Sequence, residues 1–317
     1  MKAPPLLLGY PSSEAFLKQT EALIPKSEAK KFAYLATNAL PPVTSVTSLA
    51  VLFQYSPRFV VAMAIRTANY YRRFTLPKGT RRRNIDAPRV SLKLIQSWFG
   101  HHFARAINLN DCVHGFVPGR STVSAAKEHC LAKWVLSLDI KDFFPSVDED
   151  RVVQILCDQR YTPKAARLLA RLFTLNGRLP QGAPTSPVLA NLAFDRTDRR
   201  LCVLALKHGL KYTRYADDLI FSSTEPCESK AIQVEIIEAI RKDGWVIATR
   251  KTRLTHAPHR MDVLGLVVNG ESPRLPKSMR NQIRLMTYQL ERGERAEKEL
   301  RRLRGYVAYA KSVEGEK

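Results

Sequence analysis

The stretch that decides the fold is KYTRYADDLIFSS, residues 211–223. Its two parts, 212–215 and 219–222, are rich in aromatic and branched side chains, which favours two β-strands. Asp217 and Asp218 are then expected at the tip of a tight hairpin. Two adjacent carboxylates repel each other, and a divalent cation removes that cost. The stretch therefore predicts a metal-binding turn, against the ordinary alternative of a solvated Asp-Asp turn.

A third carboxylate follows an apolar segment upstream, in WVLSLDIKDFFP at residues 134–145. The run WVLSL predicts a short strand that ends at Asp139. If that strand neighbours the hairpin, Asp139 completes a set of three carboxylates. Oxygen ligands without a nearby His or Cys cluster suit Mg²⁺ better than zinc, and phosphoryl transfer uses such ions.

A third motif, LPQGAPTSP at residues 179–187, is a turn-rich loop that leads into the helical pattern VLANLAFDRTDRRL. Gln181 supplies an amide and Gly182 supplies bare backbone, which allows close approach to a flat ligand. The order of the three motifs, more than any one of them, indicates a phosphoryl-transfer enzyme.

The segment 71–88, YRRFTLPKGTRRRNIDAP, predicts two strands joined by a turn at Pro-Lys-Gly. Arginine forks in this segment would suit a clamp on a triphosphate. Strand alternation places Arg81 and Arg83 on the face opposite to Arg82. The alternative is a solvated edge strand, because Lys and Arg side chains blunt exposed sheet edges.

Composition favours a polyanionic partner. The 317 residues include 51 Lys and Arg against 29 Asp and Glu, a net charge of +22. Such an excess creates a positive field that attracts nucleic acid. No apolar run approaches the roughly 20 residues of a membrane-spanning helix. The apolar run near the N-terminus, three leucines between prolines, is too short for a signal-peptide core. Five cysteines without a CxxC pair predict reduced thiols and a cytoplasmic location, not a disulfide framework.

Taken in order, these motifs resemble those of reverse transcriptases. DIKDFFPS resembles the motif with the first catalytic aspartate, LPQGAPTSP the nucleotide-contacting loop, and YADD the central signature. Further matches are the fingers hairpin at 71–88, the next palm motif at 244–252, the strand leading to the thumb at 263–268, and part of a short thumb at 304–307. The resemblance spans about residues 45–317.

The resemblance implies an α+β right-hand polymerase with fingers, an antiparallel-sheet palm and a short helical thumb. Its expected division is an N-terminal extension at 1–45, fingers with the start of the palm at 46–133, palm at 134–255 and thumb at 256–317. The segment 278–311 is helical by pattern, with a dense basic face that would follow a template–primer backbone. A solvated amphipathic helix is the alternative for that face.

The resemblance also implies roles for single residues. Asp139, Asp217 and Asp218, with the backbone carbonyl of Ile140, would bind two Mg²⁺ ions. One ion would lower the pKa of the primer hydroxyl, and the other would hold the triphosphate. Lys251 would protonate the pyrophosphate leaving group.

Nucleotide contacts follow from the same resemblance. Gln181 would position the incoming nucleotide, and the aromatic ring of Phe144 would exclude a ribose 2′-hydroxyl; a core phenylalanine is the alternative, and Phe143 is the better core candidate. The implied nucleotide-binding residues are Lys78, Arg81, Arg83, Phe144, Gln181 and Gly182.

Within the family, the RYADD and LPQGAP wording and the compact length look most like bacterial retron reverse transcriptases. The NAxxH element of retrons falls on residues 125–129, AAKEH, where His129 is kept as an RNA-contact candidate. The VTG element falls on 263–265, VLG. Arg304 and Tyr306 are further RNA-binding candidates.

A retron enzyme would copy a structured noncoding RNA from dNTPs into branched, RNA-linked single-stranded DNA. It would act in antiphage defence with a separate effector protein. Two alternatives stay open. One is a different bacterial reverse transcriptase, of group II intron, diversity-generating or other defence type. The other is a non-catalytic RNA-binding scaffold.

Overall fold

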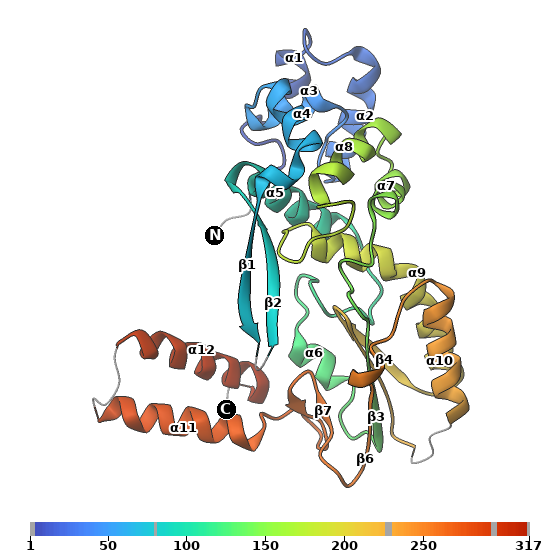
Figure 1. Cartoon of the computed structure of the whole chain (residues 1–317), viewed down its shortest axis with the longest axis vertical. Helices are drawn as coiled ribbons and strands as arrows, with labels where there is room; N and C mark the ends of the chain where they lie inside the picture. Colours follow the sequence, from blue (N-terminus) through green and yellow to red (C-terminus); the bar gives the residue numbers. More distant parts are fainter. Residues whose placement is uncertain (1–3, 79–80, 226–229, 293–296, 316–317) are drawn as a thin grey trace. The chain divides into compact units, whose positions relative to one another are not determined.

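The computed structural model describes residues 4–78, 81–225, 230–292 and 297–315. The chain forms two compact units, each made of two separate segments. Unit 1 comprises Met1–Leu109 and Asp142–Arg196, and unit 2 comprises Asn110–Lys141 and Thr197–Lys317. Figure 1 traces the chain through both. The fingers, palm and thumb boundaries stay predictions, because neither unit is one continuous segment.

Unit 1 is mainly helical. Its helices are α1 (Ser13–Gln19), α2 (Lys26–Thr37), α3 (Val46–Phe53), α4 (Pro57–Ile65), η1 (Thr67–Tyr70), α5 (Val90–Ala106), α7 (Glu149–Asp158), α8 (Pro163–Phe173) and the first half of α9 (Ser186–Lys207). Aromatic rings of α5 and α8 pack in the core of unit 1. The centroid of the Phe99 ring lies 4.7 Å from that of Phe103 on α5 and 4.6 Å from that of Phe173 on α8. Phe99 and Phe103 are both fully buried, so they attach α5 to the core of unit 1.

A β-hairpin completes unit 1, as the segment 71–88 predicted. Strand β1 (Tyr71–Lys78) pairs antiparallel with β2 (Arg81–Pro88), from Tyr71 opposite Pro88 to Lys78 opposite Arg81. The predicted turn at Pro-Lys-Gly includes Gly79, which lies outside the described residues.

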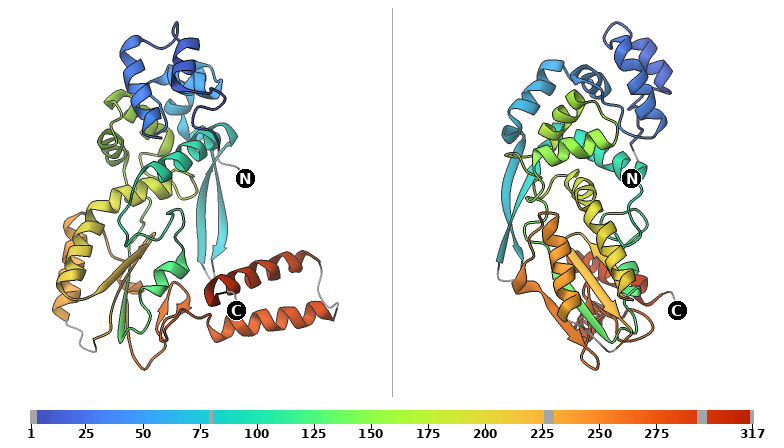
Figure 2. Two further views of the ribbon diagram at one scale, coloured as in Figure 1. Left: turned by 180° about the vertical axis from the view of Figure 1, so that it is seen from behind. Right: turned by 90° about the vertical axis from the view of Figure 1, so that its right-hand side faces the viewer.

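Unit 2 is built around an antiparallel sheet. Within the described residues its strand order is β4 (Lys211–Tyr215), β5 (Asp218–Ser223), β3 (Trp134–Asp139) and β6 (Arg253–His256). Helices α6 (Thr122–Lys127), α10 (Lys230–Lys242) and the second half of α9, with the short η2 (Thr249–Lys251), complete this part. Figure 2 shows α10 beside α9. The order puts β3, the strand that ends at Asp139, directly beside β5.

The C-terminal part of unit 2 differs in two ways from the sequence prediction. Residues 263–268 do not form one strand; they contain a tight hairpin of β7 (Asp262–Val263) and β8 (Leu266–Val267). Leu264 and Gly265 turn the chain with φ of 51° and 82°. The helical segment 278–311 is divided between α11 (Lys277–Glu291) and α12 (Glu297–Glu314), which lie side by side (Figure 2).

The β7–β8 hairpin is anchored by apolar packing. Val263 and Leu266 are fully buried, and they share a cluster with Val135 of β3, Ile220 of β5 and Val313 of α12. One hydrophobic cluster therefore joins the sheet to the C-terminal helices.

Two expectations from composition concern the whole chain. Among the residues that the structure describes, no single helix is long and apolar enough to span a membrane; α3 and α4 reach that length only together, and the chain bends by 113° between them. The described cysteines, Cys112, Cys130, Cys157 and Cys202, are free thiols.

Candidate active site

The structure brings the aspartates of two motifs together in unit 2. In the register of β3 with β5, Asp139 lies opposite Asp218. The backbone N–H of Ile140 donates to the carbonyl of Asp217 at 2.9 Å, so the strand ends are tied beyond the last pair. Asp139 is 7% exposed, whereas Asp217 and Asp218 are partly exposed. A carboxylate from a neighbouring strand therefore joins the hairpin, as expected.

The turn before these aspartates is held in an unusual backbone conformation. Ala216 has φ of 56°, in the left-handed region that non-glycine residues seldom adopt. Gly115 packs directly on it: a Cβ added at Gly115 would lie 2.5 Å from the backbone nitrogen of Ala216. Only a glycine fits there, so the preceding loop supports the turn from one side.

A buried ion pair also supports the turn. The side chains of Arg214 and Asp198 are both fully buried, with Nη2 and Oδ2 2.6 Å apart. Nη1 of Arg214 donates to the carbonyl of Ala216 at 3.1 Å, and the Tyr212 hydroxyl donates to Asp198 at 2.8 Å. Burial opposes the charge on Arg214, but the Asp198 carboxylate outweighs it and raises the pKa of the guanidinium. Sequence reasoning missed this pair; its only signal is an arginine next to YADD.

Lys251 lies at the same end of the sheet. Its Nζ donates to Oδ2 of Asp139 at 2.6 Å, and its side chain is about half exposed, at 51%. The backbone N–H of Ala248 donates to the carbonyl of Asp139 at 2.8 Å, which fixes the segment before Lys251 against β3. The ammonium group of Lys251 therefore stands beside Asp139, the third carboxylate of the predicted set.

Asp139, Asp218 and Lys251 line one cavity of about 380 Å³, together with Arg253, Arg260 and Asp262. The candidate donors are the carboxylate oxygens of Asp139 and Asp218, because the third carboxylate of the lining, Asp262, pairs with Arg260 at 2.7 Å. Oxygen donors fit a hard cation such as Mg²⁺. Across the described parts of the chain, no group of three or more His, Cys, Asp or Glu side chains is arranged to hold a metal ion. The cavity thus offers two of the three expected carboxylates, and Asp217 is not among its lining residues.

In unit 1 the LPQG loop is attached to the β1–β2 hairpin. The carbonyl of Gln181 accepts from the backbone N–H of Asp86 in β2 at 2.9 Å. Gly182 has φ of 127°, and an added Cβ would lie 2.8 Å from the carbonyl oxygen of Asp86. The bare backbone of Gly182 therefore faces β2. The sequence suggested that a bound ligand requires glycine here, whereas the structure shows that close packing against β2 requires it.

The other predicted nucleotide contacts are placed only in part. Arg83 is exposed on β2, and the side chains of Lys78 and Arg81 lie outside what the structure describes. Phe143 is 5% exposed and packs on Phe194 at 5.9 Å between ring centroids. Phe144 is half-buried, so Phe143 is the core member of the pair, as predicted.

The predicted RNA contact of His129 is wrong for its side chain. His129 is fully buried, with Nδ1 2.7 Å from the Ser222 hydroxyl and Nε2 2.7 Å from the Thr213 hydroxyl. Burial lowers its pKa to about 3. His129 therefore bridges β5 and β4 as a neutral ring, a role that a lone histidine in a sequence cannot reveal.

The two other RNA candidates lie on α12. Arg304 is exposed, and Tyr306 is half-buried. The guanidinium of Arg302 lies 5.5 Å from the centroid of the Tyr306 ring and donates to its hydroxyl at 3.1 Å. A basic side chain is thus stacked against an aromatic ring on this helix, and its contact with RNA stays a prediction.

Comparison with known proteins adds an independent line of evidence. A family model described as reverse transcriptase (RNA-dependent DNA polymerase) matches residues 76–268. The chain is 33% identical to the Retron Mx65 reverse transcriptase of Myxococcus xanthus over 288 residues, covering 85% of this chain and 66% of that protein. It is 32% identical to the Retron Mx162 reverse transcriptase of the same organism, covering 79% and 59%.

A third relative is closer in length. The Retron Ec86 reverse transcriptase of Escherichia coli is 30% identical over 256 residues, covering 80% of this chain and 79% of that protein. The chain spans less than two thirds of the length of each Myxococcus relative. All three matches are long enough to include the sequence motifs as well as the segments between them.

Proposed function

Because the chain belongs to the reverse transcriptase family, with its α+β right-hand polymerase fold, we propose that it is an RNA-directed DNA polymerase. The observation that carries this proposal is the pairing of Asp139 with Asp218 at the ends of adjacent antiparallel strands. Lys251 donates a hydrogen bond to Asp139 and lines the same cavity as both aspartates. A relict scaffold would have no reason to keep these three side chains in one cavity.

The proposed chemistry assigns a task to each group. Asp139, Asp217 and Asp218, with the carbonyl of Ile140, would hold two Mg²⁺ ions. When bound, such ions activate the primer 3′-hydroxyl and neutralise the triphosphate. Lys251, which donates a hydrogen bond to Asp139, would protonate the pyrophosphate leaving group.

The remaining contacts orient the substrate. Gln181 would position the incoming dNTP, with Gly182, Lys78, Arg81 and Arg83 at the triphosphate. These residues come from the loop and the hairpin that Asp86 ties together. Phe144 would exclude the ribose 2′-hydroxyl.

We further propose a retron-type substrate, which the similarity to three retron reverse transcriptases supports. The enzyme would copy a structured noncoding RNA into branched, RNA-linked DNA, starting from a 2′-hydroxyl of that RNA. It would act in the bacterial cytoplasm, in antiphage defence with a separate effector protein. The exposed basic residues of α11 and α12, among them Arg284 and Arg304, would follow the template–primer backbone.

The test is purification of the protein from its native locus, followed by sequencing of the copurifying nucleic acid with and without RNase. A short single-stranded DNA joined to one structured RNA, and absent from Asp217→Asn, is expected. Asp150→Asn, an exposed carboxylate on α7, is the matched control and should retain the product.

The other outcomes separate the parts of the proposal. RNA alone, with extension of supplied primers only, would keep the polymerase and discard the retron substrate. Wild-type extension by Asp217→Asn, or no extension on any template, would contradict the polymerase itself.

A further inference from the structure

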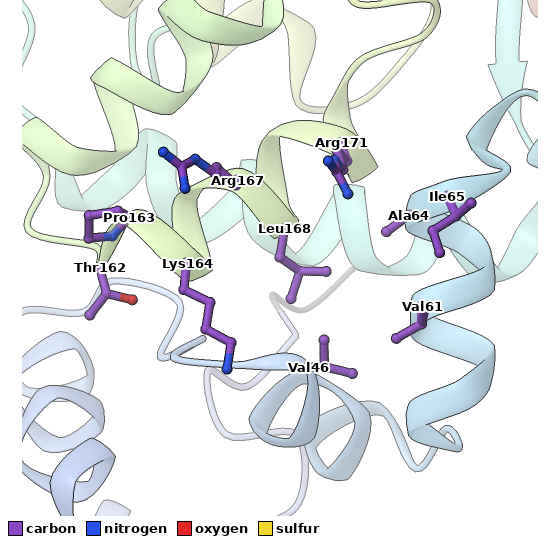
Figure 3. Close-up of a pocket in the computed structure, with 10 residues that line it drawn as sticks. All are labelled: Val46, Val61, Ala64, Ile65, Thr162, Pro163, Lys164, Arg167, Leu168 and Arg171. Carbon is purple, nitrogen blue, oxygen red and sulfur yellow. The ribbon is translucent and has the colours of Figure 1, made fainter.

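Unit 1 contains an apolar groove that takes no part in the proposed chemistry. It is formed by α8 on one side and by α3 and α4 on the other, with a volume of about 610 Å³. Figure 3 shows Leu168 of α8 pointing toward Val46 and Val61. All residues that line the groove belong to unit 1.

The floor of the groove is aliphatic and open to solvent. Val61 and Ile65, one helical turn apart on α4, are 38% and 68% exposed. The opposite face of α8 already packs in the core through Leu169 and Phe173. Leu168 is half-buried at the groove. Exposed aliphatic side chains gathered on adjacent helices, as Val61 and Ile65 are here, are typical of an interaction site.

Three basic side chains border this floor. Lys164, Arg167 and Arg171 are exposed on α8, and their spacing places them along one helix face over about 10 Å, or two turns. None of the described residues lining the groove is acidic. Glu149 lies 3.9 Å from Nε of Arg171, so Lys164 and Arg167 contribute most of the local positive charge.

Nucleic acid would match the basic border of the groove but not its aliphatic floor. Proteins hold single strands by stacking bases on aromatic rings, and none of the described lining residues is aromatic. A helix with an aliphatic stripe flanked by carboxylates matches both the aliphatic floor and the basic border of the groove. Helices that bind in grooves use anchor side chains one and two turns apart, which is also the spacing of the basic residues on α8.

We propose that this groove binds an amphipathic, acidic helix of a separate partner protein. The aliphatic stripe of the partner lies on Val61, Ile65 and Leu168, and its carboxylates pair with Lys164 and Arg167. This interaction is independent of polymerisation, because no residue of the groove belongs to the proposed active site.

The test uses the full chain and a fluorescent helical peptide of about 20 residues, long enough to form a helix, with leucines on one face and glutamates beside them. Saturable binding is expected by fluorescence anisotropy. Ile65→Asp and Arg167→Glu should each weaken it by about tenfold or more. A peptide with lysines in place of the glutamates should bind Arg167→Glu better than the wild type.

The matched control is Leu94→Asp, since Leu94 is 53% exposed on α5 and does not line the groove. It should bind the acidic peptide as the wild type does, and all variants should keep their circular dichroism and primer extension. Four results would overturn the proposal. They are an equal loss of binding in Leu94→Asp, no binding up to about 1 mM peptide, loss of single-stranded RNA binding in Ile65→Asp, and a dimer in light scattering that Ile65→Asp dissociates.

Discussion

Arg214 donates a hydrogen bond from Nη1 to the carbonyl of Ala216, 3.1 Å away, and so connects its buried ion pair to the turn before Asp217 and Asp218. A left-handed alanine has no intrinsic reason to persist, because that conformation costs free energy for any residue with a Cβ. The guanidinium of Arg214 holds the carbonyl of Ala216 by this hydrogen bond. The conformation of the turn therefore depends on a charge that is never exposed to solvent.

Asp198→Asn is expected to lower the free energy of unfolding by about 3 kcal/mol or more, because it leaves the buried Arg214 charge uncompensated. Urea unfolding followed by circular dichroism measures the change. Asp111→Asn is the control, since it removes a salt bridge of similar length, 2.7 Å to Arg120, from an exposed position. Equal effects of the two substitutions would contradict the importance assigned to burial.

Gly182→Ala is expected to destabilise the chain by about 1–3 kcal/mol, because its Cβ would meet the backbone of β2. The dNTP KM should rise with it, since the LPQG loop would move away from the hairpin. Gly177→Ala is the matched control: φ is also positive, at 71°, but an added Cβ there meets nothing within 4 Å. A similar KM for both variants would show that the contact with Asp86 does not position the loop.

Lys251→Arg separates proton donation from charge. A guanidinium retains the positive charge beside Asp139 but does not release a proton at neutral pH. Lys251→Arg and Lys251→Gln should therefore both lower kcat by about 10²-fold or more, while gel-shift affinity for a primer–template stays near that of the wild type. Single-turnover extension measures the rate. A near-normal kcat for Lys251→Arg would contradict proton donation and show that only the positive charge at this position matters.

Phe144→Ala is expected to increase incorporation of ribonucleotides relative to deoxyribonucleotides, because the ring would no longer exclude the 2′-hydroxyl. The ratio of kcat/KM for the two substrates measures selectivity. Phe143→Ala serves as the comparison: it removes a buried ring and should cost about 3–5 kcal/mol of stability without relaxing selectivity. Unchanged selectivity in Phe144→Ala would assign Phe144 to packing.

Because His129 is buried as a neutral ring, the free energy of unfolding is expected to fall in acid. Its pKa is about 3 in the folded chain, below the ordinary value of 6.5, because burial disfavours the imidazolium. Between these two values the unfolded chain binds the additional proton, so stability falls as the pH drops from about 6.5 toward 3. The slope of unfolding free energy against pH should be shallower in His129→Asn than in the wild type. Parallel slopes would contradict the assignment.

The strands and the pairing of the aspartates were accessible from sequence because their signals are local. Aromatic and branched runs end at Asp139 and flank Asp217 and Asp218, and each run forms the strand that it predicts. The expectation that β3 and β5 are neighbours then follows from the hypothesis that the three carboxylates share a metal site. Local patterns predict each strand, whereas the pairing of β3 with β5 joins segments that Asp142–Arg196 separates in the sequence.

The supports of the site were not accessible, because they depend on partners distant in sequence. Asp198 lies within an ordinary helical pattern, and nothing local indicates that it neutralises Arg214. The same holds for His129, whose hydroxyl partners come from two different strands. Leu264 misled for another reason: leucine gives no turn signal, although its φ of 51° makes it part of one.

The interleaving of the two units has a consequence for biosynthesis. Asp139 emerges from the ribosome with the segment Asn110–Lys141, but Asp218 follows only after Asp142–Arg196 of unit 1 has been made. Until then β3 lacks the strand that pairs with it, and non-local pairing of this kind is slow. A chain whose translation stops before β5 therefore holds Asp139 without the Asp218 that lies opposite it. The two carboxylates can meet only after the Asp142–Arg196 segment of unit 1 has been synthesised between them.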